Sequence, residues 1–327
     1  MTDELFVSMS LYDANTNTTI QRLPDDPDYE LDIFIPREAW CGEIHRVPKM
    51  KKIRFMFGSC DSEYYDDYKK HGEIIFFSNF WLFEHIRDLN IEDVRDTEFE
   101  FKRLGIAMTN YPKMHRRILY KYLDKYDILD QCYYSWVTPF GEKGYIHNGN
   151  YIWENEDIKK TLPSQSDISS KVSTNFEFKT PIEYKKSFLD IVSETSQNII
   201  FITEKSWRPI IFGKPFIING AKGIHQSLQK MGFLLYDEIF DYSFDSIDNL
   251  EDRVKELTYQ IDSIKDEDYE ELWDKIYYKL RYNQQLAFTM VKNEIGVPKI
   301  EDKFRLWEWI VSASKKRLLE IEDKISI

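Results

Sequence analysis

Short apolar runs that end abruptly at glycine or a small polar residue recur along this chain, and they constrain its fold more than any other feature of the sequence. The run Ile53–Phe57 ends at Gly58 and Ser59, and Glu73–Ser78 has the same character. Both have the length and continuous hydrophobicity of strands in a parallel sheet. A stretch with apolar side chains at helical spacing, Trp81–Leu89, follows them. This order of strand and helix predicts an α/β fold.

The same alternation continues further along the chain. Arg103–Thr109 predicts a strand, and Lys113–Tyr126 predicts an amphipathic helix after it. Three more strands are expected at Phe188–Val192, Asn198–Ile202 and Pro215–Ile218, each followed by a stretch that can form a helix. The chain is therefore long enough, and regular enough, for two α/β units.

Other regions lack this alternation. The first fifty residues mix short apolar clusters with Asp, Asn and Pro, and we expect edge structure or loops there. Residues 139–180 are polar and rich in Gly and Ser, which predicts a long loop. Residues 250–286 and 303–325 are charged but amphipathic, so the C-terminal part is expected to be helical.

The composition narrows the environment of the protein. Hydrophobic residues make up 42% of the chain and aromatic residues 16%, which is enough for a folded core. No apolar run approaches the roughly 18 residues that a membrane span needs, and the N-terminal stretch lacks the features of a signal peptide. The three cysteines are widely spaced and odd in number, as expected for reduced thiols. We therefore expect a cytoplasmic protein.

The charge of the chain bears on its partners. With 44 basic and 57 acidic side chains the formal net charge is −13, which weighs against broad binding of duplex DNA. A local basic pocket is still compatible with this balance. The acidic segment Asp237–Asp245 has no D-x-D after a strand, so we expect a solvent-facing loop there and no metal site.

The densest group of chemically useful residues lies between residues 201 and 220. Thr203 follows a predicted strand and is suited to cap a helix, with Glu204 and Lys205 in the first turn. There a carboxylate can accept hydrogen bonds from ribose hydroxyls, and an ammonium can neutralise a diphosphate. The sequence thus indicates a nucleotide clamp, although an adjacent Glu-Lys pair is more often a solvated helix start.

This segment resembles the nucleotide-binding half of the α-1,3-fucosyltransferase family. That family has a T-E-K turn, and after it a glycine and a proline that introduce a strand. The matching residues of this chain are Thr203, Glu204, Lys205, Gly213 and Pro215, preceded by the strand that ends at Glu194 and, further upstream, by Thr109, Asn110, Arg116, Leu123 and Tyr126. The resemblance covers roughly residues 103 to 245 and depends on the order of three motifs.

Two details are closer to the glycosyltransferases of phages and large viruses than to a typical fucosyltransferase. They are His115-Arg116 at a helix start and Trp207-Arg208-Pro209 after the T-E-K turn. The resemblance implies two facing Rossmann-like domains, the GT-B architecture, with a helical C-terminus. Residues 1–102 would form the acceptor-side domain and residues 103–300 the nucleotide-sugar-binding domain. Residues 301–327 would form a helix that packs back on the N-terminal half.

The resemblance also implies roles for individual residues. The expected donor-binding residues are Asn110, Arg116, Glu194, Thr203, Glu204 and Lys205. A reaction that inverts the anomeric carbon also needs a base, and sites in open α/β sheets lie beyond the carboxyl ends of strands. The candidate bases that follow predicted strands in the N-terminal half are Asp61, Glu63 and Glu84.

The sequence therefore predicts a glycosyltransferase that moves a sugar from a nucleotide sugar to a hydroxyl acceptor such as a glycan, with inversion, without a metal and without a further cofactor. One alternative is a glycosyltransferase that acts on hydroxymethylated pyrimidines in phage DNA, for which the basic stretch from Lys113 to Arg117 is the local support. Another is a non-catalytic protein that binds a nucleotide or glycan.

Overall fold

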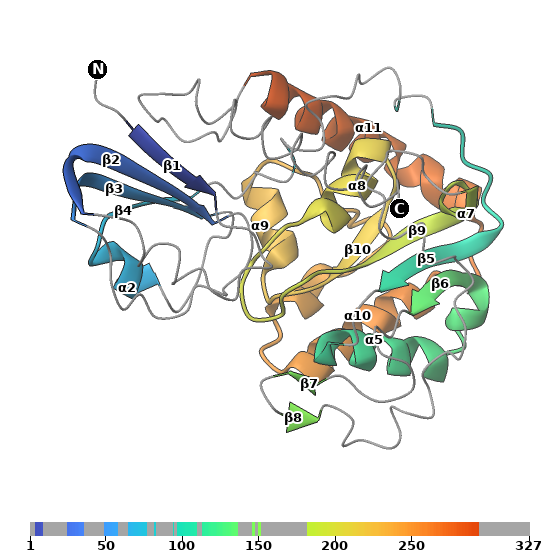
Figure 1. Ribbon diagram of the computed structural model, residues 1–327. Helices are drawn as coiled ribbons and strands as arrows, with labels where there is room; N and C mark the ends of the chain where they lie inside the picture. Colours follow the sequence, from blue (N-terminus) through green and yellow to red (C-terminus); the bar gives the residue numbers. More distant parts are fainter. Residues whose placement is uncertain are drawn as a thin grey trace, which may run out of the picture.

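The computed structural model describes residues 4–8, 25–35, 49–57, 65–76, 82, 94, 97–109, 113–136, 146–147, 150–151 and 182–293. These residues form two separate four-stranded parallel sheets, together with a small antiparallel pair made by β7 (Ile146–His147) and β8 (Asn150–Tyr151) (Figure 1). The predicted α/β class with parallel sheets is confirmed. None of the helices in the described ranges has the length and hydrophobicity needed to cross a membrane.

The first sheet has the strand order β1-β2-β3-β4. Its strands are β1 (Glu4–Ser8), β2 (Asp26–Ile35), β3 (Met50–Phe57) and β4 (Glu73–Phe76). The expectation of edge structure or loops in the first fifty residues is wrong for β2, which lies inside the sheet. The reason is visible in residues 30–35, where acidic and apolar residues alternate from 30 to 33 with the period of a strand and a short apolar run follows.

One face of the first sheet is packed against a short helix. Ile53 and Phe55 of β3 are buried, and the Phe55 ring meets the ring of Tyr68 edge to face at 5.0 Å. Tyr68 belongs to α2 (Tyr65–Lys69), which lies in the connection from β3 to β4. The apolar run that predicted β3 is therefore buried by the helix that follows it.

The second sheet has the order β10-β9-β5-β6, with all strands parallel. Its strands are β5 (Arg103–Thr109), β6 (Cys132–Trp136), β9 (Ser187–Ser193) and β10 (Phe216–Asn219). The chain moves from β5 to β6 in one direction across the sheet and from β9 to β10 in the other. Because parallel crossovers are right-handed, this reversal places the two connecting helices on opposite faces.

The helices around the second sheet follow that rule. They are α5 (Met114–Lys125), α7 (Ile182–Lys185), α8 (Glu204–Phe212), α9 (Ile224–Lys230), α10 (Leu250–Asp262) and α11 (Tyr269–Lys292), with single 3-10 turns at Leu129–Gln131 and Tyr242–Ser246. Helix α5 packs with α10, and α8 packs with α11, on opposite sides of the strands (Figure 1). The predicted C-terminal helices are confirmed up to residue 292, while residues 303–325 lie outside the described ranges.

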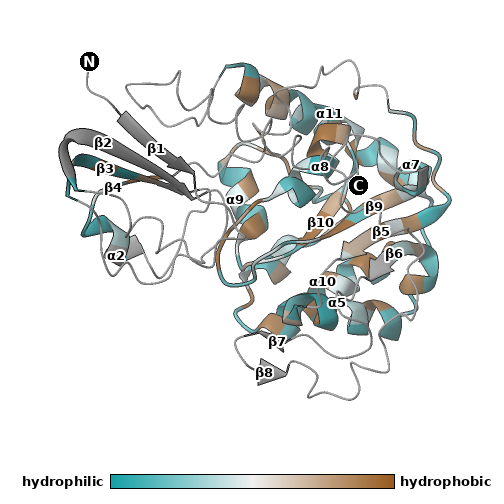
Figure 2. Cartoon of the chain, in the orientation of Figure 1, coloured by the Kyte–Doolittle hydropathy of each residue, from teal (hydrophilic) through white to brown (hydrophobic). Residues whose placement is uncertain are grey.

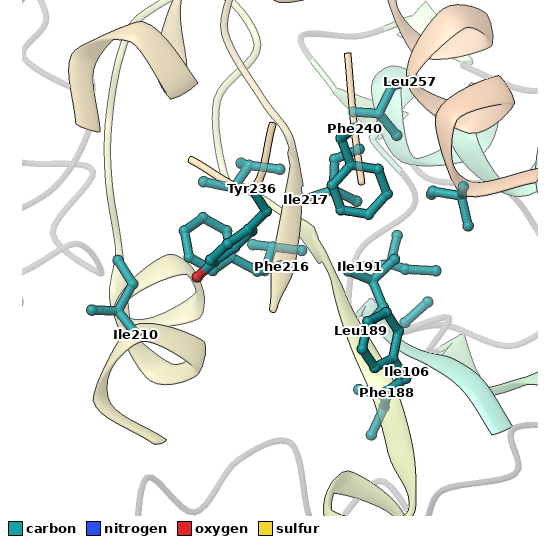
Figure 3. Close-up of a cluster of buried hydrophobic side chains, with 14 of the residues drawn as sticks. Ile106, Phe188, Leu189, Ile191, Ile210, Phe216, Ile217, Tyr236, Phe240 and Leu257 are labelled. Carbon is teal, nitrogen blue, oxygen red and sulfur yellow. The ribbon is translucent and has the colours of Figure 1, made fainter. Parts of the chain in front are cut away.

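The main core lies around β9, whose seven residues are all buried. Figure 3 shows Ile210 of α8 on one side of the β9 and β10 strands and Leu257 of α10 on the other, with Phe216 and Ile217 between them. Figure 2 shows hydrophobic colour concentrated on these strands and polar colour on the outer parts of the helices. A strand buried on both faces is typical of the centre of a parallel sheet.

The predicted strand at Asn198–Ile202 is wrong, because the chain from Glu194 to Thr203 forms a loop. The hydroxyl of Ser196 accepts hydrogen bonds from the backbone N–H groups of Asn198 and Ile199, both at 3.3 Å, and this turns the chain. Phe201 and Ile202 are buried all the same. Their hydrophobicity is explained by core packing rather than by strand pairing.

Candidate functional site

The point where the order of the second sheet reverses lies between β5 and β9. In open α/β sheets ligands bind outside the carboxyl ends of the strands at such a point. Here β5 ends at Thr109 and β9 ends at Ser193. The residues that follow these two strands are therefore the first place to look for a site. Asn110, one of the predicted donor-binding residues, comes directly after β5 and lies outside the described ranges.

The start of α5 is held against the end of β9 by three cationic or imidazole side chains. Lys113 Nζ donates to the carbonyl oxygen of Thr195 at 2.5 Å. Arg116 Nη2 donates to the carbonyl oxygen of Glu194 at 3.0 Å, and His115 Nε2 donates to the same oxygen at 2.8 Å. A carbonyl oxygen orients a cation without neutralising it. These bonds therefore fix the direction of the positive groups at the start of the helix.

The N-cap residue of α5, Lys113, does not cap the helix with its side chain, and the first turn of α5 has no acidic residue. Helix α9 shares both features, whereas α8, α10 and α11 each begin with a side-chain cap. The first N–H groups of a helix carry partial positive charge and favour an anion. At α5 this partial charge lies beside Lys113 and Arg116, so the two effects have the same sign.

Together with burial, the positive charges near the start of α5 contribute to a lowered pKa of His115. The pKa of His115 is lowered to about 3, first by burial and then by the positive charges of Arg116, Lys113 and Arg253. His115 and Arg116 are only 1% and 3% exposed. A chain with a net charge of −13 thus has a locally positive, largely buried region at the carboxyl end of its second sheet.

The second part of the site is the start of α8. Thr203 caps this helix by accepting a hydrogen bond from Lys205 N. Lys205 Nζ donates to Glu204 Oε1 at 2.7 Å and to the hydroxyls of Thr195 and Thr203, both at 3.2 Å. Its side chain remains 27% exposed, and that of Glu204 remains 14% exposed. The predicted cap, carboxylate and ammonium therefore have the predicted local geometry.

Glu194 joins the two parts, and it is completely buried. Its Oε1 accepts hydrogen bonds from Thr203 N at 2.9 Å and from the Ser206 hydroxyl at 2.6 Å. Its Oε2 accepts from the Thr203 hydroxyl at 2.7 Å and from Thr195 N at 3.1 Å. The carboxylate of Glu194 is thus occupied on both oxygens by groups of the protein.

The end of β10 completes the arrangement. Asn219 Nδ2 donates to the carbonyl oxygen of His115 at 2.9 Å, which ties β10 to the start of α5. Gly220 follows, and a Cβ there would lie 3.0 Å from Ile224 Cδ1 and 3.4 Å from Glu194 Cβ. A side chain at this position would therefore crowd the loop that holds Glu194.

The structure thus brings together five of the six predicted donor-binding residues, Arg116, Glu194, Thr203, Glu204 and Lys205, around residues 193–195. The predicted bases Asp61, Glu63 and Glu84 lie outside the described ranges. The sequence analysis did not assign Asn219 to the site, and it weighed Lys113 as a binding residue only within the basic stretch considered for DNA. Their positions in the sequence could have indicated both residues. Lys113 lies between a strand and the helix that follows it, and Asn219 is the last residue of a strand.

The acidic segment that was expected to face solvent is partly buried. Asp245 is 6% exposed, and its Oδ1 accepts a hydrogen bond from His225 Nδ1 at 2.9 Å. His225 Nε2 in turn accepts from the backbone N–H of Ile218, so the imidazole connects α9 to β10. Within the described ranges no group of three or more His, Cys, Asp or Glu residues is placed to hold a metal ion.

No protein-family model and no curated protein matches this chain. A solved structure of the DNA-modifying enzyme beta-glucosyltransferase, determined in the presence and absence of its substrate uridine diphosphoglucose, aligns with 88% of this chain and 82% of that chain. The TM-score of the alignment is 0.42 and the sequence identity is 13%. Similarity of this size does not assign the chain to a family, so any function has to come from the site itself.

Proposed function

We propose that the protein is a glycosyltransferase that binds a nucleotide sugar at the carboxyl end of its second sheet. The observation that supports this most is the meeting of two helix starts, those of α5 and α8, on residues 193–195, with Lys113, Arg116 and Lys205 around them. A diphosphate is the anion that such an arrangement fits, because the N-terminus of α5 and the ammonium of Lys205 at the start of α8 both favour phosphate oxygens. The resemblance to the fucosyltransferase family agrees with this assignment.

In this proposal the cations stabilise the departing nucleoside diphosphate. Lys205 lies beside the charge that develops on the leaving oxygen, while the buried Arg116 acts on it through its positive charge without direct contact. Groups fixed in advance lose little energy in reorganising. Glu204 is the residue that accepts hydrogen bonds from the ribose. A carboxylate of residues 1–102 removes the proton of the acceptor hydroxyl, and Asp61, Glu63 and Glu84 are the candidates. The first sheet then belongs to the acceptor-side domain and residues 301–327 pack back on it, as in the GT-B architecture.

A DNA acceptor is less favoured by the structure. Its local support was the basic stretch from Lys113 to Arg117, but His115, Arg116 and Arg117 are all at most 3% exposed. A protein that holds a duplex needs basic side chains on its surface, where they can reach phosphates along the backbone. This stretch is not such a surface.

The test is calorimetric titration of the full chain with UDP, GDP and dTDP. We expect one of them to bind, and we expect Lys205→Met and Glu204→Gln each to weaken that binding by about 1.5–3 kcal/mol, the size of a charge-assisted hydrogen bond. Lys230→Met, which replaces an exposed lysine in the last turn of α9, is the matched control and should bind like the wild type. Equal affinity of the site variants and the control would reject the clamp.

Activity assays on the same protein preparation distinguish an enzyme from a non-catalytic binding protein. Slow hydrolysis of the matching sugar nucleotide, or transfer to a glycan acceptor, indicates a transferase, whereas binding without turnover indicates the non-catalytic alternative. In the transferase, Asp61→Asn, Glu63→Gln or Glu84→Gln is expected to lower turnover by ~10²–10⁴-fold while leaving diphosphate affinity unchanged. If all three retain wild-type turnover, the base lies elsewhere in the chain.

A further inference from the structure

The hydroxyl of Thr203 has a defined direction in this structure. Its oxygen lies 2.7 Å from Glu194 Oε2, and both residues are buried. A carboxylate only accepts hydrogen bonds, so the proton of the hydroxyl points at Glu194. The lone pairs of the same oxygen are then directed to Lys205, which donates to it from its backbone N–H at 3.4 Å and from Nζ at 3.2 Å.

Thr195 provides a second connection between Glu194 and Lys205. The backbone N–H of Thr195 donates to Glu194 Oε2 at 3.1 Å, and the hydroxyl of Thr195 accepts from Lys205 Nζ at 3.2 Å. Among the described residues the Lys205 ammonium donates three hydrogen bonds, and two of them go to Thr195 and Thr203, which Glu194 holds in place. The third goes to the neighbouring Glu204.

These contacts do not suit Glu194 or Thr203 for touching a diphosphate. Phosphate oxygens are acceptors, and the only proton of the Thr203 hydroxyl is directed to Glu194. Glu194 is itself 0% exposed, and its negative charge would repel a phosphate. Lys205 is the member of this group that combines a donor, a positive charge and solvent exposure.

We infer that Glu194 and Thr203 are positioning residues, which set the place of the Lys205 ammonium and do not contact the ligand. This inference rests on the proposed function, since it concerns how the diphosphate clamp is built. It also changes the roles that the sequence assigned to these two residues. Of Glu194, Thr203 and Lys205, only Lys205 keeps the role of direct contact with phosphate.

The first experiment compares Thr203→Val, which removes the hydroxyl, with Thr203→Ser, which keeps it. The probes are UDP and GDP together with uridine and guanosine, which lack phosphate. Thr203→Val is expected to weaken diphosphate binding about tenfold and to leave nucleoside binding unchanged, whereas Thr203→Ser recovers most of the loss. An equal loss for diphosphate and nucleoside would contradict the inference, because it would indicate general damage to the fold.

The second experiment asks whether the effect passes through Lys205. In a Lys205→Met background, Thr203→Val and Glu194→Gln are expected to cause no further loss of diphosphate affinity, since effects that act through one group are not additive. Additive losses would show that Thr203 or Glu194 contacts the ligand directly, and would overturn the inference. If Glu194→Gln does not fold, the pair of Thr203 variants decides the question.

A third measurement is independent of nucleotide. If the wild type binds none of UDP, GDP and dTDP, the proposed function fails. The position of Lys205 is then judged by its rate of acetylation with acetic anhydride, followed by peptide mass. Thr203→Val is expected to raise that rate severalfold and Thr203→Ser to leave it near the wild-type value. Equal rates in all three proteins would mean that Thr203 does not position Lys205.

Discussion

At the scale of single residues, His115 shows how strongly the site depends on burial. The side chain lies under the end of β9, and its Nε2–H donates to the Glu194 carbonyl oxygen at 2.8 Å. Burial, with the positive charge of Arg116 second, lowers the pKa of this imidazole to about 3. The unfolded chain has no such environment, so the histidine takes up a proton there near pH 6.5.

The difference in pKa predicts an acid-sensitive fold. Between pH 6.5 and pH 3 the unfolded state binds a proton at His115 that the folded state does not, so stability falls as the pH falls through this window. At pH 5 the expected loss from this residue is about 2 kcal/mol. In His115→Gln, whose side chain cannot be protonated, the free energy of unfolding from urea titration should fall by about 2 kcal/mol less between pH 7 and pH 5 than in the wild type. Identical pH profiles for the two proteins would contradict the assigned environment.

The residue scale also shows what a sequence can predict about a site. Thr203, Glu204 and Lys205 could be predicted because they are adjacent, and a helix start imposes their geometry locally. Asn219 could not, because its role is a bond to the backbone of His115, far away in the chain. The sequence predicts that Glu194 binds the donor, and its four side-chain hydrogen bonds to the protein are the basis for inferring a positioning role instead.

At the scale of elements, continuous apolar runs were the dependable signal. β5 and β9 were predicted with nearly the observed bounds, since both are buried on two faces. β6 (Cys132–Trp136) was missed because its sequence, CYYSW, has no aliphatic run and its identity as a strand comes from pairing with β5. The loop at Asn198–Ile202 was mistaken for a strand because burial without pairing leaves the same pattern.

The contact between β5 and its neighbours gives an element-scale prediction. A Cβ at Gly105 would lie 3.2 Å from both Ile191 Cδ1 and the carbonyl oxygen of Leu189, and 3.3 Å from Cys132 Sγ. The carbonyl belongs to the paired strand β9 and cannot move without disturbing the sheet. Gly105→Ala is therefore expected to destabilise the protein by about 1–3 kcal/mol, measured as a lower urea midpoint. An unchanged midpoint would contradict the close approach of β5 and β9 at Gly105.

At the scale of the whole molecule, a strongly acidic chain surrounds a basic site. A net charge of −13 repels a nucleotide at long range, and the screening length at physiological salt is about 8 Å. The local cations act only within that distance. Added salt screens both the long-range repulsion and the attraction within the clamp, so we expect its two effects on nucleotide affinity to have opposite signs.

The same distribution of charge predicts the metal dependence of turnover. In the mechanism that we propose, Lys113, Arg116 and Lys205, with the start of α5, supply the positive charge that the leaving diphosphate requires. Turnover is expected to persist in EDTA at the wild-type rate, measured with the sugar nucleotide identified by calorimetry. Loss of activity on chelation, with recovery on adding Mn²⁺ or Mg²⁺, would assign that charge to a metal instead.

The pairing of β5 with β9 has a consequence for how the protein acquires its activity. Gly105 lies opposite Leu189, so the strands that flank the site come from distant parts of the chain. Closing so long a loop is slow, and pairings of this kind are made late in folding. During synthesis the start of α5 emerges well before residues 193–195, and until they arrive its cations lack the carbonyl groups that orient them. Ligand recognition is therefore among the last properties that a newly made chain gains.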